Sequence, residues 1–317
     1  MDINALATMA RDIVAAGDHL RPTAARRLVE VQPGLSILRE RERTAFESML
    51  YEPTFCLILQ GRKQTTFGDT TYASSAGQCL VISHDIAVDA RVVEAPYMSL
   101  LMRLDVGLLR SLADDVAAAG FAHDAGATMT VKPAAPELLD ALGRLLSSTS
   151  SSISSSSSSS SSSSAAMVQA SVLAPLVVKE LHYRLLLAPC GGMLRRMALH
   201  DPSASAVARA VAHIKKHFRD DIGVPQLTKL AGMSASSFHR HFKAVMASTP
   251  LQYQKDLRLL EARRLITQQG MAITAAAFDV GYESPSQFTR EYGRKFGVAP
   301  SRDVARDAVV VSSSTAA

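Results

Sequence analysis

The sequence predicts an α+β protein in two parts, an N-terminal antiparallel sheet domain with flanking helices and a C-terminal region of helices only. Short segments rich in β-branched and aromatic residues follow one another from position 55 to 104, separated by glycine- and proline-containing turns. After position 201 the chain has helical periodicity and repeats a pattern of helix, turn and helix. Residues 201–317 also hold 16 lysines and arginines against 10 acidic residues, whereas residues 1–200 hold 18 against 19.

The composition is that of a folded protein large enough for two domains. The chain has 317 residues, of which 47% are hydrophobic. It lacks an apolar run of membrane-spanning length, and its acidic start, MDINALATMARDIVAAGDHL, is unlike a signal peptide. Three cysteines are too few for a disulfide framework. We therefore expect a cytoplasmic protein without a membrane span.

In the N-terminal part, residues 2–30 are expected to form one or two helices, with Pro22 at the break. The expected strands are 55–60, 65–67, 70–73, 79–83, 88–93 and 98–104, at a spacing typical of a small antiparallel barrel or sandwich. Further helices are expected at 104–120, 136–148 and 171–188. The segment from Ser147 to Ser164 is almost pure serine, and we expect it to be disordered because it cannot bury apolar area.

In the C-terminal part, a helix is expected at 204–218, followed by two similar units. The units share a glycine, two aromatic residues four positions apart and a proline: Gly232, Phe238, Phe242 and Pro250 in the first, and Gly281, Phe288, Tyr292 and Pro300 in the second. Glycine suits a turn because it adopts positive φ without a Cβ clash, and the serine that follows caps the next helix. A helix over 250–267 would join the units, and its length of ~27 Å is compatible with two helices about one DNA turn apart, ~34 Å.

The second helix of each unit has one apolar and one polar face. The polar face carries Arg, Lys, Gln, Ser, Thr and His, which are the side chains that proteins use to recognise base edges and to hold phosphates. A single helix of this kind is as well explained by a solvated surface, but two copies with one spacing favour a tandem helix-turn-helix. The expected phosphate contacts are Ser237, Lys243, Arg263, Arg294 and Lys295.

The runs LTKLAGMSASSFHRHFKAVMASTPLQYQKDLRLLEARRLI and ITAAAFDVGYESPSQFTREYGRKFGVAPSRD resemble the DNA-binding domain of AraC-type transcription regulators, over roughly residues 205–303. Thr228 and Ala276 depart from the family pattern at packing positions. The resemblance implies base-reading roles for Ser236, His239 and Arg240 in the first unit and for Ser286, Gln287, Thr289 and Arg290 in the second.

The stretch EPTFCLILQGRKQTTFGDTTYASSAGQCLVIS resembles the cupin-like N-terminal domain of one branch of the same family. This resemblance implies a β-barrel that binds a small-molecule effector, and helices, with 171–188 as the candidate, that form a homodimer. The implied protein is a regulator of transcription that binds double-stranded promoter DNA and contacts RNA polymerase. The expected domains are 1–195 and 196–305, followed by a disordered tail, 306–317.

Other functions agree less well with the sequence. A metal-dependent cupin enzyme needs several histidines, and the strand region offers only His84 beside Asp85, so we expect neither catalysis, nor a metal, nor a cofactor. Cys56 and Cys79 are expected to be buried as small hydrophobic residues, the alternative being a thiol sensor of aldehydes or redox state, which the family resemblance makes conceivable. A non-specific DNA-packaging protein is a further alternative.

Overall fold

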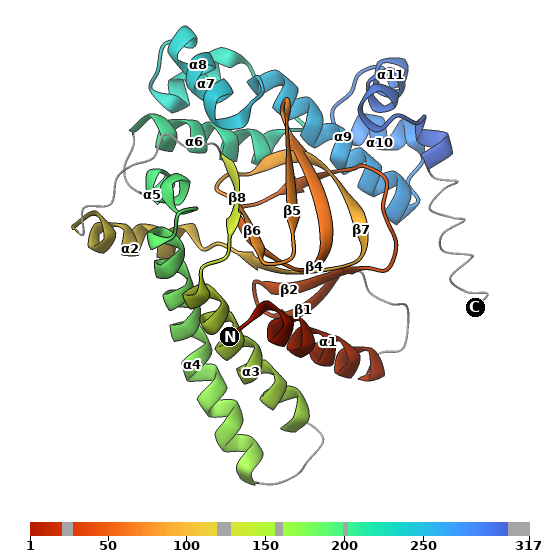
Figure 1. The fold of residues 1–317 in the computed structure, drawn as a ribbon. Coiled ribbons are helices and arrows are strands. Elements are labelled where there is room, and N and C mark those ends of the chain that lie inside the picture. The colour runs from red at the N-terminus through yellow and green to blue at the C-terminus, as the bar shows by residue number, and fades with distance from the viewer. Residues whose placement is uncertain (21–27, 119–127, 156–160, 199–201, 304–317) are drawn as a thin grey trace.

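The computed structural model of the chain describes residues 1–20, 28–118, 128–155, 161–198 and 202–303. A curved antiparallel sheet lies at the centre, with helices below it from the N-terminal part and helices above it from the C-terminal part (Figure 1). This layout confirms the predicted α+β fold class. None of the described helices combines the length and the apolar content that a membrane span requires.

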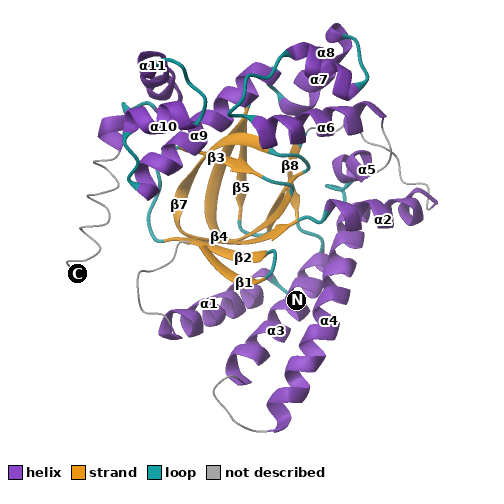
Figure 2. Ribbon diagram, turned by 180° about the vertical axis from the view of Figure 1, so that it is seen from behind, coloured by secondary structure: helices purple, strands orange, loops and turns teal. Residues whose placement is uncertain are grey.

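Within the described residues the sheet has eight strands, antiparallel in every pair. They are β1 (Leu28–Gln32), β2 (Leu35–Glu40), β3 (Glu47–Tyr51), β4 (Thr54–Phe67), β5 (Thr70–Ser75), β6 (Gln78–Ile82), β7 (Ile86–Arg103) and β8 (Met129–Pro133). β4 and β7 pair with each other along most of their length and bend, so the sheet curls around an interior (Figure 2).

Two of the sequence predictions for this sheet were wrong. The segments 55–60 and 65–67 form the single strand β4, and 88–93 and 98–103 form the single strand β7, because register shifts in the β4–β7 ladder let both strands bend without ending. Residues 28–30 were expected to be helical but belong to β1. Exposed and half-buried side chains alternate along the start of this strand, which pairs antiparallel with β2. Residues 21–27, including Pro22, lie outside the described residues.

The two faces of the sheet bury different partners. Phe55, Leu57 and Leu59 of β4 point to one face and pack with α1 (Ile3–Leu20), α2 (Val106–Ala118), α3 (Pro136–Ser155), α4 (Ser161–Leu187) and α5 (Gly192–Ala198). Cys56 and Ile58, between them in sequence, point to the concave face and belong to a second hydrophobic cluster. That second cluster continues into the C-terminal helices.

The serine run is helical where the structure describes it, contrary to the prediction of disorder. α3 continues to Ser155 and α4 begins at Ser161, while 156–160 lies outside the described residues. The apolar part of α3 before the serine run is buried against the sheet domain. The hydroxyls of Ser147 and Ser148 donate hydrogen bonds to the carbonyls of Gly143 and Leu145 in the preceding turn. The packed beginning of α3 thus nucleates a helix that serine alone would not form.

The C-terminal part contains the two predicted helix-turn-helix units. Its helices are α6 (Pro202–His217), α7 (Val224–Ala231), α8 (Ala235–Met246), α9 (Pro250–Gln269), α10 (Ile273–Asp279) and α11 (Pro285–Phe296). The turn glycines have positive φ, 66° at Gly232 and 88° at Gly281. Ser234 and Ser284 cap the helices α8 and α11 by accepting a backbone N–H three residues on.

One helix, α9, holds both units. Tyr253 and Leu257 in its first half pack with Phe242 of the first unit, whereas Leu265 and Ile266 in its second half pack with the core of the second. The apolar face of α9 therefore changes direction after Leu257, because the helix packs against two separate cores. Its 20 residues give it a length of ~30 Å.

Candidate nucleic-acid interface

The second helix of each unit presents the predicted polar face to solvent. Phe238, Phe242 and Met246 of α8 are buried, as are Phe288 and Tyr292 of α11. All seven residues expected to contact bases are exposed: Ser236, His239, Arg240, Ser286, Gln287, Thr289 and Arg290. The periodicity therefore identified the inward and outward faces of both helices.

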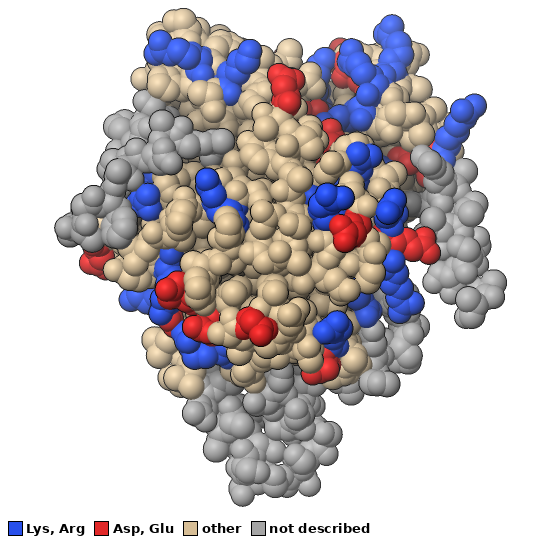
Figure 3. Space-filling model, viewed as in Figure 1, with Lys and Arg blue, Asp and Glu red and all other residues tan. Residues whose placement is uncertain are grey.

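Helices α8 and α11 stand above the two ends of α9, on the same side of the molecule (Figure 1). Lysine and arginine side chains gather over both of these corners (Figure 3). Arg240 and Arg290 make no hydrogen bond or ion pair with any other described residue, so their guanidinium groups are available to an external acceptor. This arrangement can present two cationic helices to one extended polyanion.

The expected phosphate contacts fall into two groups. Lys243 and Arg294 are exposed, and Arg294 is only loosely paired, 3.9 Å from Glu291. Arg263 instead makes a two-pronged ion pair with Asp303, at 2.8 and 3.3 Å, with its guanidinium over the ring of Phe296.

Of the other two, Lys295 lies 3.4 Å from Asp256, and Ser237 is half-buried, its backbone N–H donating to Ser234. Lys243 and Arg294 are therefore the strongest candidates for phosphate contacts.

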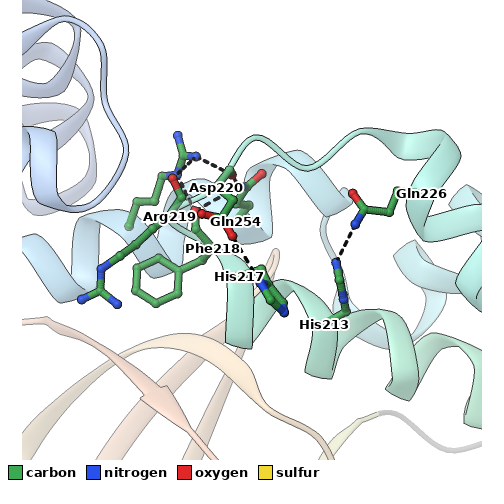
Figure 4. Close-up of polar contacts among 8 residues, drawn as sticks. His213, His217, Phe218, Arg219, Asp220, Gln226 and Gln254 are labelled. Carbon is green, nitrogen blue, oxygen red and sulfur yellow. Dashed lines mark hydrogen bonds and ion pairs between the residues drawn. The ribbon is translucent and has the colours of Figure 1, made fainter.

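The scaffold beneath these helices depends on residues that the sequence did not single out. Gln254 of α9 donates hydrogen bonds to the backbone carbonyls of Phe218 and Asp220, which follow the C-terminal end of α6 (Figure 4). Arg258 of α9 donates to the same two carbonyls. Carbonyls at a helix end have no partner within the helix, so side-chain donors such as these satisfy them. The contacts join α6 to α9, and nothing in the local sequence around residue 254 or 258 signals them.

Glu291 supports the second unit from within. It accepts hydrogen bonds from Lys255 and the hydroxyl of Tyr282, both at 2.8 Å, and from Gln287 at 3.2 Å. Burial alone would raise the pKa of Glu291, but these donors hold the pKa below its ordinary value. The carboxylate therefore stays charged and ties α11 to α9.

The concave interior of the sheet contains polar groups. Lys63 is buried, donates to the hydroxyl of Tyr51 at 2.7 Å and lies within 6.0 Å of the ring centre of Tyr97. The side-chain oxygens of Thr65, Tyr97 and Ser99 are buried without a hydrogen-bond partner in the described part of the chain. Buried hydroxyls without partners are costly, so this interior is suited to a bound water or a small polar ligand.

The cysteines are buried and unpaired by disulfides. Cys56 faces the interior of the sheet, and burial raises the pKa of its thiol. Contact with the Cys190 thiol, together with burial, raises the pKa of Cys79. A reactive sensor thiol needs a lowered pKa and access, so these environments favour the packing role over the sensing role.

His84, the histidine beside Asp85 in the strand region, bonds through Nδ1 to the hydroxyl of Ser83 at 2.8 Å. Burial and the nearby charge of Arg196 lower its pKa to about 4. Among the described residues, no three side chains of the His, Cys, Asp and Glu types are grouped so that they could hold a metal ion.

Comparison with known proteins assigns both parts of the chain. Residues 32–156 match the model of the AraC-type transcriptional regulator N-terminus, and residues 227–306 match a helix-turn-helix domain. The chain therefore carries the N-terminal domain of the AraC-type transcriptional regulators, followed by a helix-turn-helix domain.

Several AraC-type regulators are similar to it in sequence. It is 30% identical over 131 residues to the HTH-type transcriptional regulator ExsA of Pseudomonas aeruginosa, an overlap of 41% of this chain and 47% of ExsA. It is 28% identical over 115 residues to the HTH-type transcriptional activator RhaS of Escherichia coli, an overlap of 35% of this chain and 41% of RhaS. The chain thus spans less than half the length of these curated relatives.

A solved structure resembles most of the molecule in fold. An apo variant of ToxT from Vibrio cholerae superposes with a TM-score of 0.51 at 10% identity, covering 84% of this chain and 96% of ToxT. At that identity the likeness concerns the fold alone, and it confirms the order of a sheet domain followed by tandem helix-turn-helix units.

The sheet domain and the first helix-turn-helix unit share one hydrophobic cluster. Ile82 and Ile86 of the sheet belong to it together with Val211 and Ile214 of α6, and Phe242 of α8. Lys215 of α6 adds a polar contact, because its Nζ lies 2.8 Å from both Glu52 and Asp85 of the sheet domain.

The predicted domain boundary at residue 195 falls inside α5, whose Met193, Leu194 and Met197 pack with the N-terminal helices. A division just after α5 therefore fits the packing better, and the division itself stays a prediction. The predicted tail, 306–317, lies outside the described residues.

Proposed function

We propose that the chain is a sequence-specific DNA-binding regulator of transcription whose activity responds to a small molecule sensed by its N-terminal domain. One observation carries this proposal: α8 and α11 are capped helices with exposed arginine faces, held on one side of the molecule by the shared helix α9. Side chains of these types recognise base edges in the major groove. The AraC-type relatives, named as transcriptional regulators, support the same role.

The proposed base contacts are the seven exposed residues of α8 and α11, and the proposed phosphate contacts are led by Lys243 and Arg294. Footprinting with the purified full chain, upstream of its own and neighbouring genes, tests the proposal. A protected site of one or two helical turns at a defined sequence supports it. Uniform protection along every fragment would instead favour the DNA-packaging alternative.

The effector is proposed to bind inside the curved sheet, near Lys63. The cation, the hydroxyl of Tyr51 and the unpartnered oxygens of Thr65, Tyr97 and Ser99 form a polar lining on an otherwise apolar interior. Such a lining suits a compound with one polar end and an apolar body. Replacing Lys63 by Met should remove the effect of the inducing compound on DNA binding and leave binding without the compound unchanged.

Homodimerisation is proposed through α4. Val172, Leu173 and Leu176 near the middle of this helix are exposed by 59%, 44% and 58%, whereas Leu181 and Leu185 near its C-terminal end are buried within the sheet domain. Helix faces of this kind commonly pack against a second copy. Light scattering on a variant with Leu173 and Leu176 changed to Ser should then report a loss of dimer.

We further propose that the chain contacts RNA polymerase, acts in the cytoplasm where the DNA is found, and is not an enzyme. The relatives are transcriptional regulators, which supports these three points.

A further inference from the structure

A pocket of about 100 Å³ lies where the sheet domain meets the first helix of the DNA-binding part. The loop of Ser83, His84 and Asp85 between β6 and β7 forms one wall. Arg110 of α2, Met197 of α5 and Val211 of α6 contribute to the others. The pocket is separate from the interior of the sheet, and a molecule bound in it would touch both parts of the protein.

The charges around this pocket favour an anion. Arg110 is exposed and makes no hydrogen bond or ion pair with another described residue. The one carboxylate in the lining, Asp85, is already paired with Lys215 at 2.8 Å. His84 is neutral at pH 7, because burial and the charge of Arg196 lower its pKa to about 4. Nδ1 of His84 is bonded to the Ser83 hydroxyl, so the neutral imidazole donates a hydrogen bond to an anion from Nε2–H, in the tautomer in which Ser83 donates to Nδ1.

The remaining lining sets the size and the character of the ligand. Val106, Met197, Ala208 and Val211 give the pocket apolar walls. In another protein an apolar cavity of about 150 Å³ holds benzene, which has six carbons. A cavity of about 100 Å³ therefore accepts roughly four carbon-sized atoms.

We propose that this junction pocket binds a short aliphatic carboxylate of about two to four carbons, held at its charged end by Arg110 and His84 and along its chain by Val106, Met197 and Val211. Bound there, the carboxylate stabilises the packed arrangement of the two parts, because it binds that arrangement and not a separated one. It acts beside the ion pairs of Lys215 with Asp85 and Glu52, which hold the same junction.

The test uses the full chain and sodium butyrate as the probe, with sodium chloride at equal ionic strength as the reference. Isothermal titration calorimetry should show saturable binding of butyrate, and the melting temperature should rise by about 5 °C near saturation. Butanol and butylamine match the chain length but lack the carboxylate, and they should give no such response.

Three variants locate the binding site. Arg110→Gln should weaken butyrate binding on the order of tenfold, because a charge-assisted hydrogen bond is lost. Ala208→Leu fills the pocket and should abolish butyrate binding. Arg62→Gln is the control, because Arg62 is an exposed arginine on β4, outside the pocket, and its replacement should leave butyrate binding unchanged. Arg110→Gln alters only an exposed side chain, so it remains informative if Ala208→Leu fails to fold.

Absence of butyrate binding, an equal response to butanol, or unchanged binding in Arg110→Gln would overturn the inference. Binding of the operator in the absence of butyrate is measured separately on the same preparation. Because that measurement reports on the proposed function alone, the two ideas can fail independently.

Discussion

Arg258 donates a hydrogen bond from Nη1 to the carbonyl oxygen of Gly281 at 2.8 Å, which ties the connecting helix α9 to the turn of the second helix-turn-helix unit. The same guanidinium donates to the carbonyls of Phe218, Arg219 and Asp220 at 2.6, 3.2 and 2.9 Å. One side chain thus fixes the end of α6, the connecting helix and the second turn relative to one another.

The first prediction concerns this residue. Arg258→Ala leaves several backbone carbonyls without their charged donor and should lower the free energy of unfolding by roughly 2–4 kcal/mol, as measured by urea denaturation. Arg264→Ala on the same helix is the control: Arg264 is exposed and, among the described residues, pairs only with Glu261, so its loss should change the free energy of unfolding far less. Equal effects of the two substitutions would contradict the bridging role of Arg258.

The second prediction compares the two turn glycines. A Cβ at Gly281 would lie 2.1 Å from the carbonyl oxygen of Arg219, whereas a Cβ at Gly232 would have open space. Both glycines have positive φ, so Gly232→Ala should cost about 1 kcal/mol from backbone strain alone. Gly281→Ala should cost more than about 2 kcal/mol, because the backbone must also shift. Urea denaturation of both variants measures the difference, and similar values would refute the close contact.

The third prediction separates base recognition from phosphate contact. Arg240→Ala and Arg290→Ala should each weaken operator binding by about 1–3 kcal/mol, and the loss should be confined to particular base positions when mutated operators are compared. Lys243→Ala should instead weaken binding to all DNA sequences and reduce the salt dependence by about one counterion. Uniform weakening by the arginine variants would contradict sequence-specific recognition.

The sequence predicted local features of this site well and long-range ones poorly. The aromatic spacing alone identified the buried faces of α8 and α11, and the turn glycines and capping serines were visible as short motifs. Arg263 was expected at a phosphate because its charge is visible in the sequence, whereas its partner Asp303 lies 40 residues away.

Long-range contacts explain the other differences as well. The pairing of Lys215 with Asp85 spans 130 residues and leaves no local pattern. Each of the strands β4 and β7 was predicted as two shorter strands. The bulges that let a strand bend and continue depend on pairing with the neighbouring strand, which the local sequence does not show.

The fourth prediction concerns pH. The pKa of His84 falls from an ordinary 6.5 to about 4 in the folded chain. Between these values the unfolded chain binds the proton and the folded chain does not, so stability falls as the pH decreases from 6.5 toward 4. The loss is at most about 3 kcal/mol. His84→Asn should flatten this part of the stability curve in urea titrations at several pH values, and an unchanged curve would contradict the burial of a neutral imidazole.

The fifth prediction tests the thiol alternative. Cys56, Cys79 and Cys190 are exposed by only 5%, 0% and 3%. Because a thiol must be accessible and ionised to react, Ellman's reagent should modify the native chain on the order of a hundredfold more slowly than the chain in urea.

A reference thiol calibrates this measurement. Ser301 is exposed, so Ser301→Cys should react in the native protein about as fast as an unfolded thiol. If Cys56 or Cys79 reacts rapidly in the native protein, as identified by mass spectrometry, that thiol can act as a sensor. The effector would then react covalently with the thiol and not bind reversibly. If all three native cysteines react slowly while Ser301→Cys reacts fast, the cysteines have a packing role. The fast reaction of the exposed thiol shows that the reagent is active, so burial alone explains the slow reaction of the native thiols.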